Sequence, residues 1–133
     1  MRLVFMLLTI GIIGFACQKN KSETIDGDIF GRYTGTFHRT GMDTVQVNFI
    51  FKTDNTFEGS SARFQYPAIC GGSFQRSDMD LVVNDSCTWT ANFDWTLIFD
   101  GNYNIAFINE NAIRIWRTNG TVTDEYILNR FSR

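Results

Sequence analysis

Residues 45–52 have an apolar side chain at every second position, with Gln46, Asn48, Ile50 and Lys52 between them, and this alternation constrains the fold more than any other feature. Val45, Val47, Phe49 and Phe51 occupy every second position. A period of two places these side chains on one face of a half-buried β-strand. Other short runs are rich in Phe, Tyr, Trp, Val, Ile and Thr, whereas proline occurs once and no convincing amphipathic helix appears. The sequence therefore predicts an all-β protein.

Turn-forming residues separate the expected strands at intervals of roughly 8–12 residues. Asn119-Gly120 is the clearest two-residue hairpin signal, and the segments 54–55 and 100–102 mark further turns. In this scheme residues 95–99 form a strand that runs into the turn at 100–102. About eight or nine antiparallel strands fit an up-and-down barrel best, with a β-sandwich as the alternative.

The first and last expected strands carry a further pattern. Gly31-Arg32-Tyr33 opens the first strand, and Arg130 ends the last. This arrangement resembles the lipocalins, in which a late basic residue packs over an aromatic ring that follows a glycine. The resemblance implies an eight-stranded lipocalin-like barrel over residues 29–133, closed by Gly31 and by a cation–π contact between Tyr33 and Arg130. The chain lacks the C-terminal helix of that family, so a small barrel filled with side chains fits as well as a hollow one.

Residues 1–17 have the order of a secretory signal, with Arg2 followed by an apolar stretch over 3–16 and then Cys17. The stretch is shorter than the roughly 20 residues of a transmembrane helix. Ala16-Cys17 resembles the lipobox of bacterial lipoproteins, which implies cleavage before Cys17, lipidation of its thiol and anchoring through N-terminal acyl chains. Residues 17–28 then form the lipidated end and a polar tether. We expect a cell-envelope location, with the outer membrane favoured. Ordinary secretion, leaving Cys17 as a free thiol, is the alternative.

Charge and cysteine count narrow the function further. The formal net charge is −2, and removal of Arg2 with the signal makes it −3. This balance argues against nucleic-acid binding, which needs a basic patch. Cys70 and Cys87 remain as an even pair if Cys17 carries lipid, and an oxidising compartment favours a disulfide between them. A redox or metal-binding pair is the alternative.

No combination of residues predicts catalysis. His38 is the sole histidine, and Gly71-Gly72-Ser73 lacks the flanking pattern of a nucleophile elbow. Asp78, Asp85 and Asp100 are interpreted as turn residues, which disfavours a glycosidase pair among the nearby aspartates. Asp78-x-Asp80 and Asp100-Gly101-Asn102 offer oxygen ligands but complete no calcium-loop spacing. We therefore expect no enzyme activity, no cofactor and no metal.

Four aromatic residues are the candidates for contact with a ligand or partner. Trp89, Phe93 and Trp95 lie within one short segment beside Cys87, and the expected disulfide brings Tyr66 close to them. The preferred prediction is a non-enzymatic lipoprotein that binds a small apolar ligand in the barrel mouth. The alternative is a protein-interaction module, such as an inhibitor of an envelope hydrolase or a component of a surface assembly. A carrier needs an internal cavity, whereas an interaction module needs a filled barrel and a protruding loop at its rim.

Overall fold

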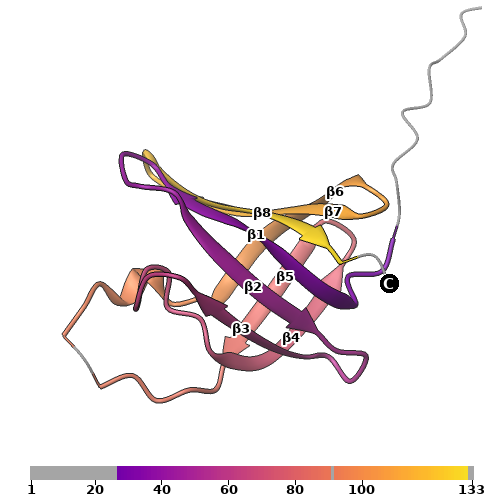
Figure 1. The fold of residues 1–133 in the computed structure, drawn as a ribbon, viewed down its shortest axis with the longest axis horizontal. Helices are drawn as coiled ribbons and strands as arrows, with labels where there is room; N and C mark the ends of the chain where they lie inside the picture. Colours follow the sequence, from indigo (N-terminus) through magenta and orange to yellow (C-terminus); the bar gives the residue numbers. More distant parts are fainter. Residues whose placement is uncertain (1–26, 91, 132–133) are drawn as a thin grey trace, which may run out of the picture.

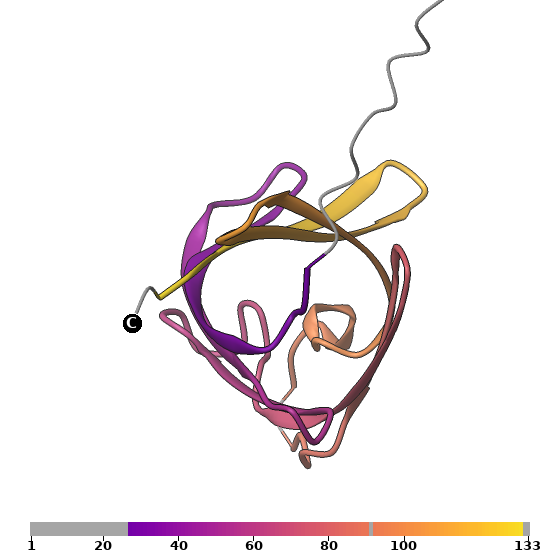
Figure 2. The same ribbon diagram turned by 90° about the vertical axis from the view of Figure 1, so that its right-hand side faces the viewer.

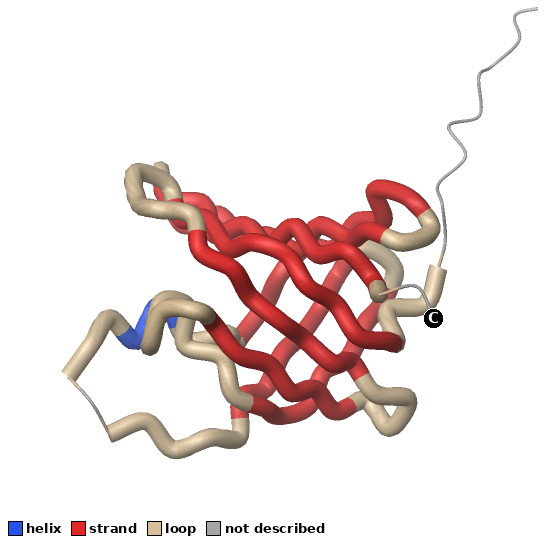
Figure 3. Tube along the Cα trace, viewed as in Figure 1, coloured by secondary structure: helices blue, strands red, loops and turns tan. Residues whose placement is uncertain are grey.

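The computed structural model describes residues 27–90 and 92–131. Within them, eight antiparallel strands form one closed barrel in which each strand pairs with the next and β8 pairs with β1 (Figures 1 and 3). The predicted all-β up-and-down barrel is therefore confirmed. The expected signal, Cys17 and the tether up to residue 26 lie outside the described residues. The strands are β1 (Gly31–Arg39), β2 (Val45–Phe51), β3 (Thr56–Ser61), β4 (Gly71–Ser77), β5 (Asp80–Asp85), β6 (Gly101–Asn109), β7 (Ala112–Asn119) and β8 (Val122–Arg130).

The connections between strands alternate between the two ends of the barrel, because each strand is antiparallel to its neighbours. One end, which we call the proximal end, holds Gly27 and the turns after β2, β4 and β6. The opposite end, the distal end, holds the connections after β1, β3, β5 and β7 (Figure 1). The chain that precedes Gly27 therefore joins the barrel at the proximal end. Figure 2 shows the strands closing into a ring.

The barrel interior is filled by aromatic rings. The strands alternate between buried and more exposed residues, as the period of two in the sequence predicts. Neighbouring rings have centroids 4.8–6.4 Å apart, the spacing of well-packed edge-on and tilted pairs. Of the two possibilities left open by the sequence, the structure has the filled barrel. The nine rings that are at most 2 % exposed are Tyr33, Phe37, Phe49, Phe51, Phe57, Phe74, Phe99, Tyr103 and Tyr126.

Strands β1 and β8 close the barrel through an unusually close approach at Gly35. A Cβ at this position would lie 1.9 Å from the carbonyl oxygen of Ile127 on β8, far inside van der Waals contact. Gly35 itself is paired with Leu128 on β8 and with Val47 on β2. Only glycine leaves room for the two backbones at this point.

The contact expected from the lipocalin resemblance is present at the proximal end. The guanidinium carbon of Arg130 lies 5.4 Å from the centre of the Tyr33 ring, and its Nη2 donates a hydrogen bond to the Tyr33 hydroxyl at 2.8 Å. Gly31 has φ +142°, and a Cβ there would touch the Arg130 side chain at 3.4 Å. This distance is ordinary van der Waals contact, so glycine is favoured at position 31 by the backbone conformation rather than by space.

Residues 95–99, expected to form a strand, do not pair as one. Trp95–Leu97 is a 3-10 turn (η1), and Asp94 caps it by accepting a hydrogen bond from the backbone N–H of Thr96. Leu97 is buried, and Phe99 packs against the rings of the barrel interior. The expected hairpin turn at 100–102 is also wrong, because β6 begins at Gly101. Burial of these two side chains outweighs the local strand propensity, so the segment closes the distal end.

Candidate functional site

An open groove of about 820 Å³ lies at the distal end of the barrel. The long connection between β5 and β6 forms one wall, and the ends of β1, β7 and β8 form the other. The barrel interior below the groove is filled, so the groove is a surface feature and not the mouth of a deep cavity. Its lining combines two arginines, four aspartates and two tryptophans with smaller residues; the charged and aromatic members are Arg39, Arg117, Asp85, Asp94, Asp100, Asp124, Trp89 and Trp95.

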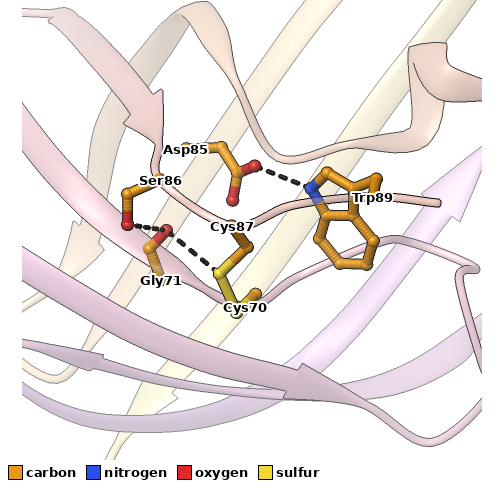
Figure 4. Close-up of a disulfide and its surroundings, with 6 residues drawn as sticks. All are labelled: Cys70, Gly71, Asp85, Ser86, Cys87 and Trp89. Atoms are coloured by element: carbon orange, nitrogen blue, oxygen red, sulfur yellow. Dashed lines mark hydrogen bonds between the residues drawn. A yellow bond between two sulfur atoms is a disulfide. The ribbon is translucent and has the colours of Figure 1, made fainter.

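A disulfide fixes the start of the β5–β6 connection. Cys70 and Cys87 are bonded, with 6.2 Å between their Cα atoms, as the cysteine count predicts. Two residues further on, the Trp89 indole N–H donates a hydrogen bond to the Asp85 carboxylate at 2.7 Å (Figure 4). The hydrogen bond to Asp85 and the nearby disulfide thus hold the ring of Trp89 close to the end of β5. The groove wall is anchored covalently at one end and by a charge-assisted hydrogen bond close by.

The three aromatic residues predicted as contact candidates form a continuous row. Trp89 meets Phe93 edge-on with 5.8 Å between ring centres, and Phe93 stacks on Trp95 at 6.0 Å. Trp95 is 58 % exposed, whereas Trp89 and Phe93 are half-buried. The row therefore ends in a large ring that faces solvent at the edge of the groove. The three rings therefore pack together, and their contact with a ligand or partner stays a prediction.

Tyr66, the fourth candidate, lies elsewhere than expected. Its side chain is only 6 % exposed, it packs edge-on against Phe37, and its hydroxyl donates a hydrogen bond to the Asp43 carbonyl. Residues 66–69 do come close to the β5–β6 connection, because Ala68 forms an isolated parallel bridge with Ile98. Tyr66 is nevertheless a core residue and not a contact residue, because its polar tip already has a partner inside the protein.

A buried ion cluster holds the floor of the groove. Asp124 on β8 accepts hydrogen bonds from Arg39 Nε at 2.6 Å, Arg39 Nη2 at 2.8 Å and Arg117 Nε at 3.2 Å. Arg39 also donates to the side chains of Asp94 and Thr96 and to the Thr96 carbonyl. Since a guanidinium has five N–H donors, these five bonds occupy all of them. The cluster ties η1 to three strands of the barrel.

Arg117 repeats this role from β7. Its Nη1 donates to the Asp100 carbonyl at 2.7 Å, and its Nη2 donates to the carbonyls of Thr96 and Ile98. The guanidinium also lies 4.6 Å from the centre of the Tyr103 ring. Sequence reasoning missed Arg39, Arg117 and Asp124. One signal in the sequence could have indicated Arg39. It occupies the same alternating positions of β1 as the buried residues Tyr33 and Phe37, and it is buried like them.

Two groove carboxylates have shifted acidity in opposite directions. Burial raises the pKa of Asp85, and the nearby negative charge of Asp100 raises it further, whereas the hydrogen bond from Trp89 lowers it. The hydrogen bonds from Thr96, followed by the attraction of Arg39, lower the pKa of Asp94. Asp94 is the more exposed of the pair, with 54 % of its side chain accessible. Aspartates interpreted from the sequence as turn residues are thus gathered at one groove.

Large apolar side chains are exposed at the tips of the distal connections. The β3–β4 connection presents Phe64, which is 84 % exposed, and the β1–β2 and β5–β6 connections present Met42 and Trp95. Val122, the first residue of β8, is exposed next to the β7–β8 turn. The Met42 and Val122 turns are joined by the hydrogen bond from Thr40 N to the Thr123 carbonyl. The distal end therefore offers scattered apolar contacts around a charged groove. Single exposed apolar residues are normal on a protein surface, whereas a large ring such as Trp95 beside a groove is a frequent anchor for a partner.

The residues considered from the sequence for catalysis or calcium binding lie outside this groove, apart from the aspartates that line it. His38 is exposed on the barrel wall, and Asp78 and Asp80 lie at the proximal end. Within residues 27–90 and 92–131, no group of three or more His, Cys, Asp or Glu is arranged to hold a metal ion.

These features define a small, closed, eight-stranded up-and-down barrel, consistent with a lipocalin-like fold, with a filled interior and an open groove at one end. No protein-family model matches the sequence, and no curated protein or solved structure is significantly similar to it. In the described part of the chain, no helix is long and apolar enough to cross a membrane.

Proposed function

We propose that this protein is a non-enzymatic cell-envelope lipoprotein whose lipocalin-like barrel binds another envelope protein through its distal end. The observation that carries the proposal is a filled interior together with an open distal groove, at whose edge the large ring of Trp95 is exposed. A protein partner uses exposed anchors around a groove, whereas an internal cargo needs space inside the barrel. The packing supports the interaction module over the carrier of a small apolar ligand.

A small apolar ligand has the distal groove as its best available position. The groove volume lies in the usual range for ligand sites. Its lining, however, includes four aspartates and two arginines, and an apolar molecule placed against them would strip them of water without returning hydrogen bonds. The charged lining therefore favours a polar or mixed surface as the occupant.

Anchoring through Cys17 would place the distal end away from the membrane. The sequence supports lipidation of Cys17, and multiple acyl chains hold a protein stably on a bilayer. Gly27, the first described residue, lies at the proximal end, where its carbonyl accepts a hydrogen bond from Arg76 Nη1 near the end of β4. In this arrangement the chain from the anchor reaches the barrel on the side opposite the groove, so the groove stays accessible to a partner.

Membrane retention tests the anchor. The Cys17→Ser variant should leave the membrane fraction and lose incorporation of radiolabelled fatty acid, because the acyl chains supply the attachment. Cys87→Ser is the matched control, since it removes a different cysteine and should keep both. Retention and labelling of the Cys17→Ser protein equal to the parent would refute lipidation at this position.

Photo-crosslinking tests the interaction surface. A photoreactive amino acid placed at Phe64 or Val122 should give one discrete adduct in intact cells, because both side chains are exposed at the distal end. Met79 and Ile108 are control positions away from the distal connections, and their exposures lie between those of Val122 and Phe64. Absence of adducts from both distal positions, or equal adducts from all four, would refute a distal docking surface.

A further inference from the structure

The two cations of the distal groove are already occupied by the protein itself. All five N–H donors of Arg39 bind Asp124, Asp94 and Thr96, and Arg117 makes four hydrogen bonds to Asp124 and to backbone carbonyls. An anionic ligand would have to break these bonds to reach either guanidinium. The arginines therefore shape the groove and do not favour a negatively charged occupant.

The groove carries more negative than positive charge. Its lining has four aspartates against two arginines, which leaves a formal charge of −2. Asp94 and Asp100 are exposed, and Asp94 also pairs with Arg39 Nη1 at 3.0 Å, whereas Asp124 is 4 % exposed and lies between the two guanidiniums. Because a carboxylate only accepts hydrogen bonds when ionised, the exposed part of the groove is complementary to a cationic donor.

An aromatic wall stands beside these carboxylates. Trp95 is exposed and stacks on Phe93, and Asp94 and Thr96 adjoin it in the chain. The face of an indole attracts a cation, and a guanidinium in particular stacks on it. A ring and carboxylates at one groove thus provide two independent attractions for the same kind of group.

We propose that the distal groove binds a basic side chain, above all an arginine, on the surface of the partner protein. This inference rests on the proposed function and specifies the chemistry of its partner. The guanidinium would lie on the Trp95 ring and donate hydrogen bonds to Asp100 and Asp94. Met42, Phe64 and Val122 would contact the protein surface around that side chain. The acidic balance of the chain adds a favourable long-range field for a basic partner.

The groove is fixed before any ligand arrives. The Cys70–Cys87 disulfide holds one end of the β5–β6 connection, and the Asp124 cluster holds the other. Little conformational entropy is therefore lost when a side chain enters, which increases the affinity that a few contacts can give.

Tryptophan indole NMR provides a direct test. The chain has three tryptophans, of which Trp89 and Trp95 line the groove and Trp116 lies on β7, where Arg114 already covers its ring at 4.2 Å. The probe is the peptide acetyl-Gly-Arg-Gly-amide, titrated to millimolar concentration into the chain from residue 17 with Cys17→Ser. The matched probe replaces arginine by citrulline, which has nearly the same shape and no charge.

We expect saturable shifts of the Trp95 and Trp89 indole signals with the arginine peptide and none at Trp116. The citrulline peptide should bind at least about fivefold more weakly, since it loses both the ion pair and most of the cation–π attraction. Asp100→Asn should weaken binding of the arginine peptide by about two- to fivefold. Asparagine keeps an oxygen that can accept the Asp85 N–H bond at 2.8 Å, so the groove retains its shape. Asp78→Asn at the proximal end is the matched control and should change nothing.

Three outcomes would overturn the inference. These are no shift at either groove tryptophan, equal binding of the two peptides, or an equal shift at Trp116. If distal crosslinks persist in any of these cases, only the basic side chain is excluded and the proposed docking surface stands. If the distal crosslinks are absent, the proposed function itself fails.

Discussion

Removing the Asp124 carboxylate should destabilise the barrel strongly. The side chain is 5 % exposed and accepts three hydrogen bonds from two arginines. In Asp124→Ala, the guanidinium of Arg39 would stay buried with fewer negative partners than before. Breaking a buried ion pair by removing one partner costs about 3–5 kcal/mol, chiefly because the remaining charge is uncompensated. Since Arg39 keeps Asp94 and Thr96, we expect the lower part of that range.

Urea unfolding followed by far-ultraviolet circular dichroism measures this change. With a denaturant slope of about 2 kcal/mol per molar urea, a loss of about 3 kcal/mol lowers the unfolding midpoint by about 1.5 M. Glu125→Ala is the matched control, because Glu125 is the next residue on β8 and pairs with Arg114 at 2.6 Å on the partly exposed wall. An exposed pair contributes about 0–1 kcal/mol, so its midpoint should fall by less than about 0.5 M.

The comparison of the two variants decides whether burial matters. Equal shifts of the midpoint for Asp124→Ala and Glu125→Ala would refute the claim that the inward cluster holds the distal end. A changed slope for Asp124→Ala alone would show that the segment from 94 to 99 unfolds separately from the barrel, and limited proteolysis within that segment would detect the same event.

Three further predictions follow from the same structure. Cys70→Ser/Cys87→Ser should lower the free energy of unfolding by about 3 kcal/mol in urea titrations, because the oxidised chain has a constrained unfolded state; an unchanged value would contradict the disulfide's role. Gly35→Ala should prevent or severely weaken folding, because its Cβ meets a carbonyl of β8 at 1.9 Å, whereas Thr36→Ala should cost about 1 kcal/mol or less, as thermal melting will show. Asp85→Asn should stabilise the protein at pH 7, because asparagine cannot ionise. The pKa of Asp85 is higher in the folded than in the unfolded protein, so stability falls as pH rises from the unfolded pKa through the folded pKa. This gain should vanish at pH values below the unfolded pKa of aspartate; a constant gain at every pH would refute the assignment to ionisation.

The sequence by itself determined the class of fold and the covalent link. The period of two at 45–52 and the Asn119-Gly120 turn are local signals, and each specifies backbone conformation within a few residues. Both appear in the structure, as β2 and as the turn between β7 and β8. The disulfide followed from counting cysteines, which requires no knowledge of tertiary contacts. The row of Trp89, Phe93 and Trp95 was also visible, because those residues are neighbours in the chain.

Only the tertiary structure decided which residues form the groove. Arg39 and Asp124 are 85 residues apart in sequence, and closure of β1 against β8 brings them together. Tertiary contacts also decided the conformation of residues 95–99. Burial of Phe99 among rings from distant strands outweighed a local preference for extended backbone. Local patterns fix which strands form, whereas the charge and shape of the distal end depend on contacts between strands that are remote in sequence. Those contacts exist only once the barrel has closed.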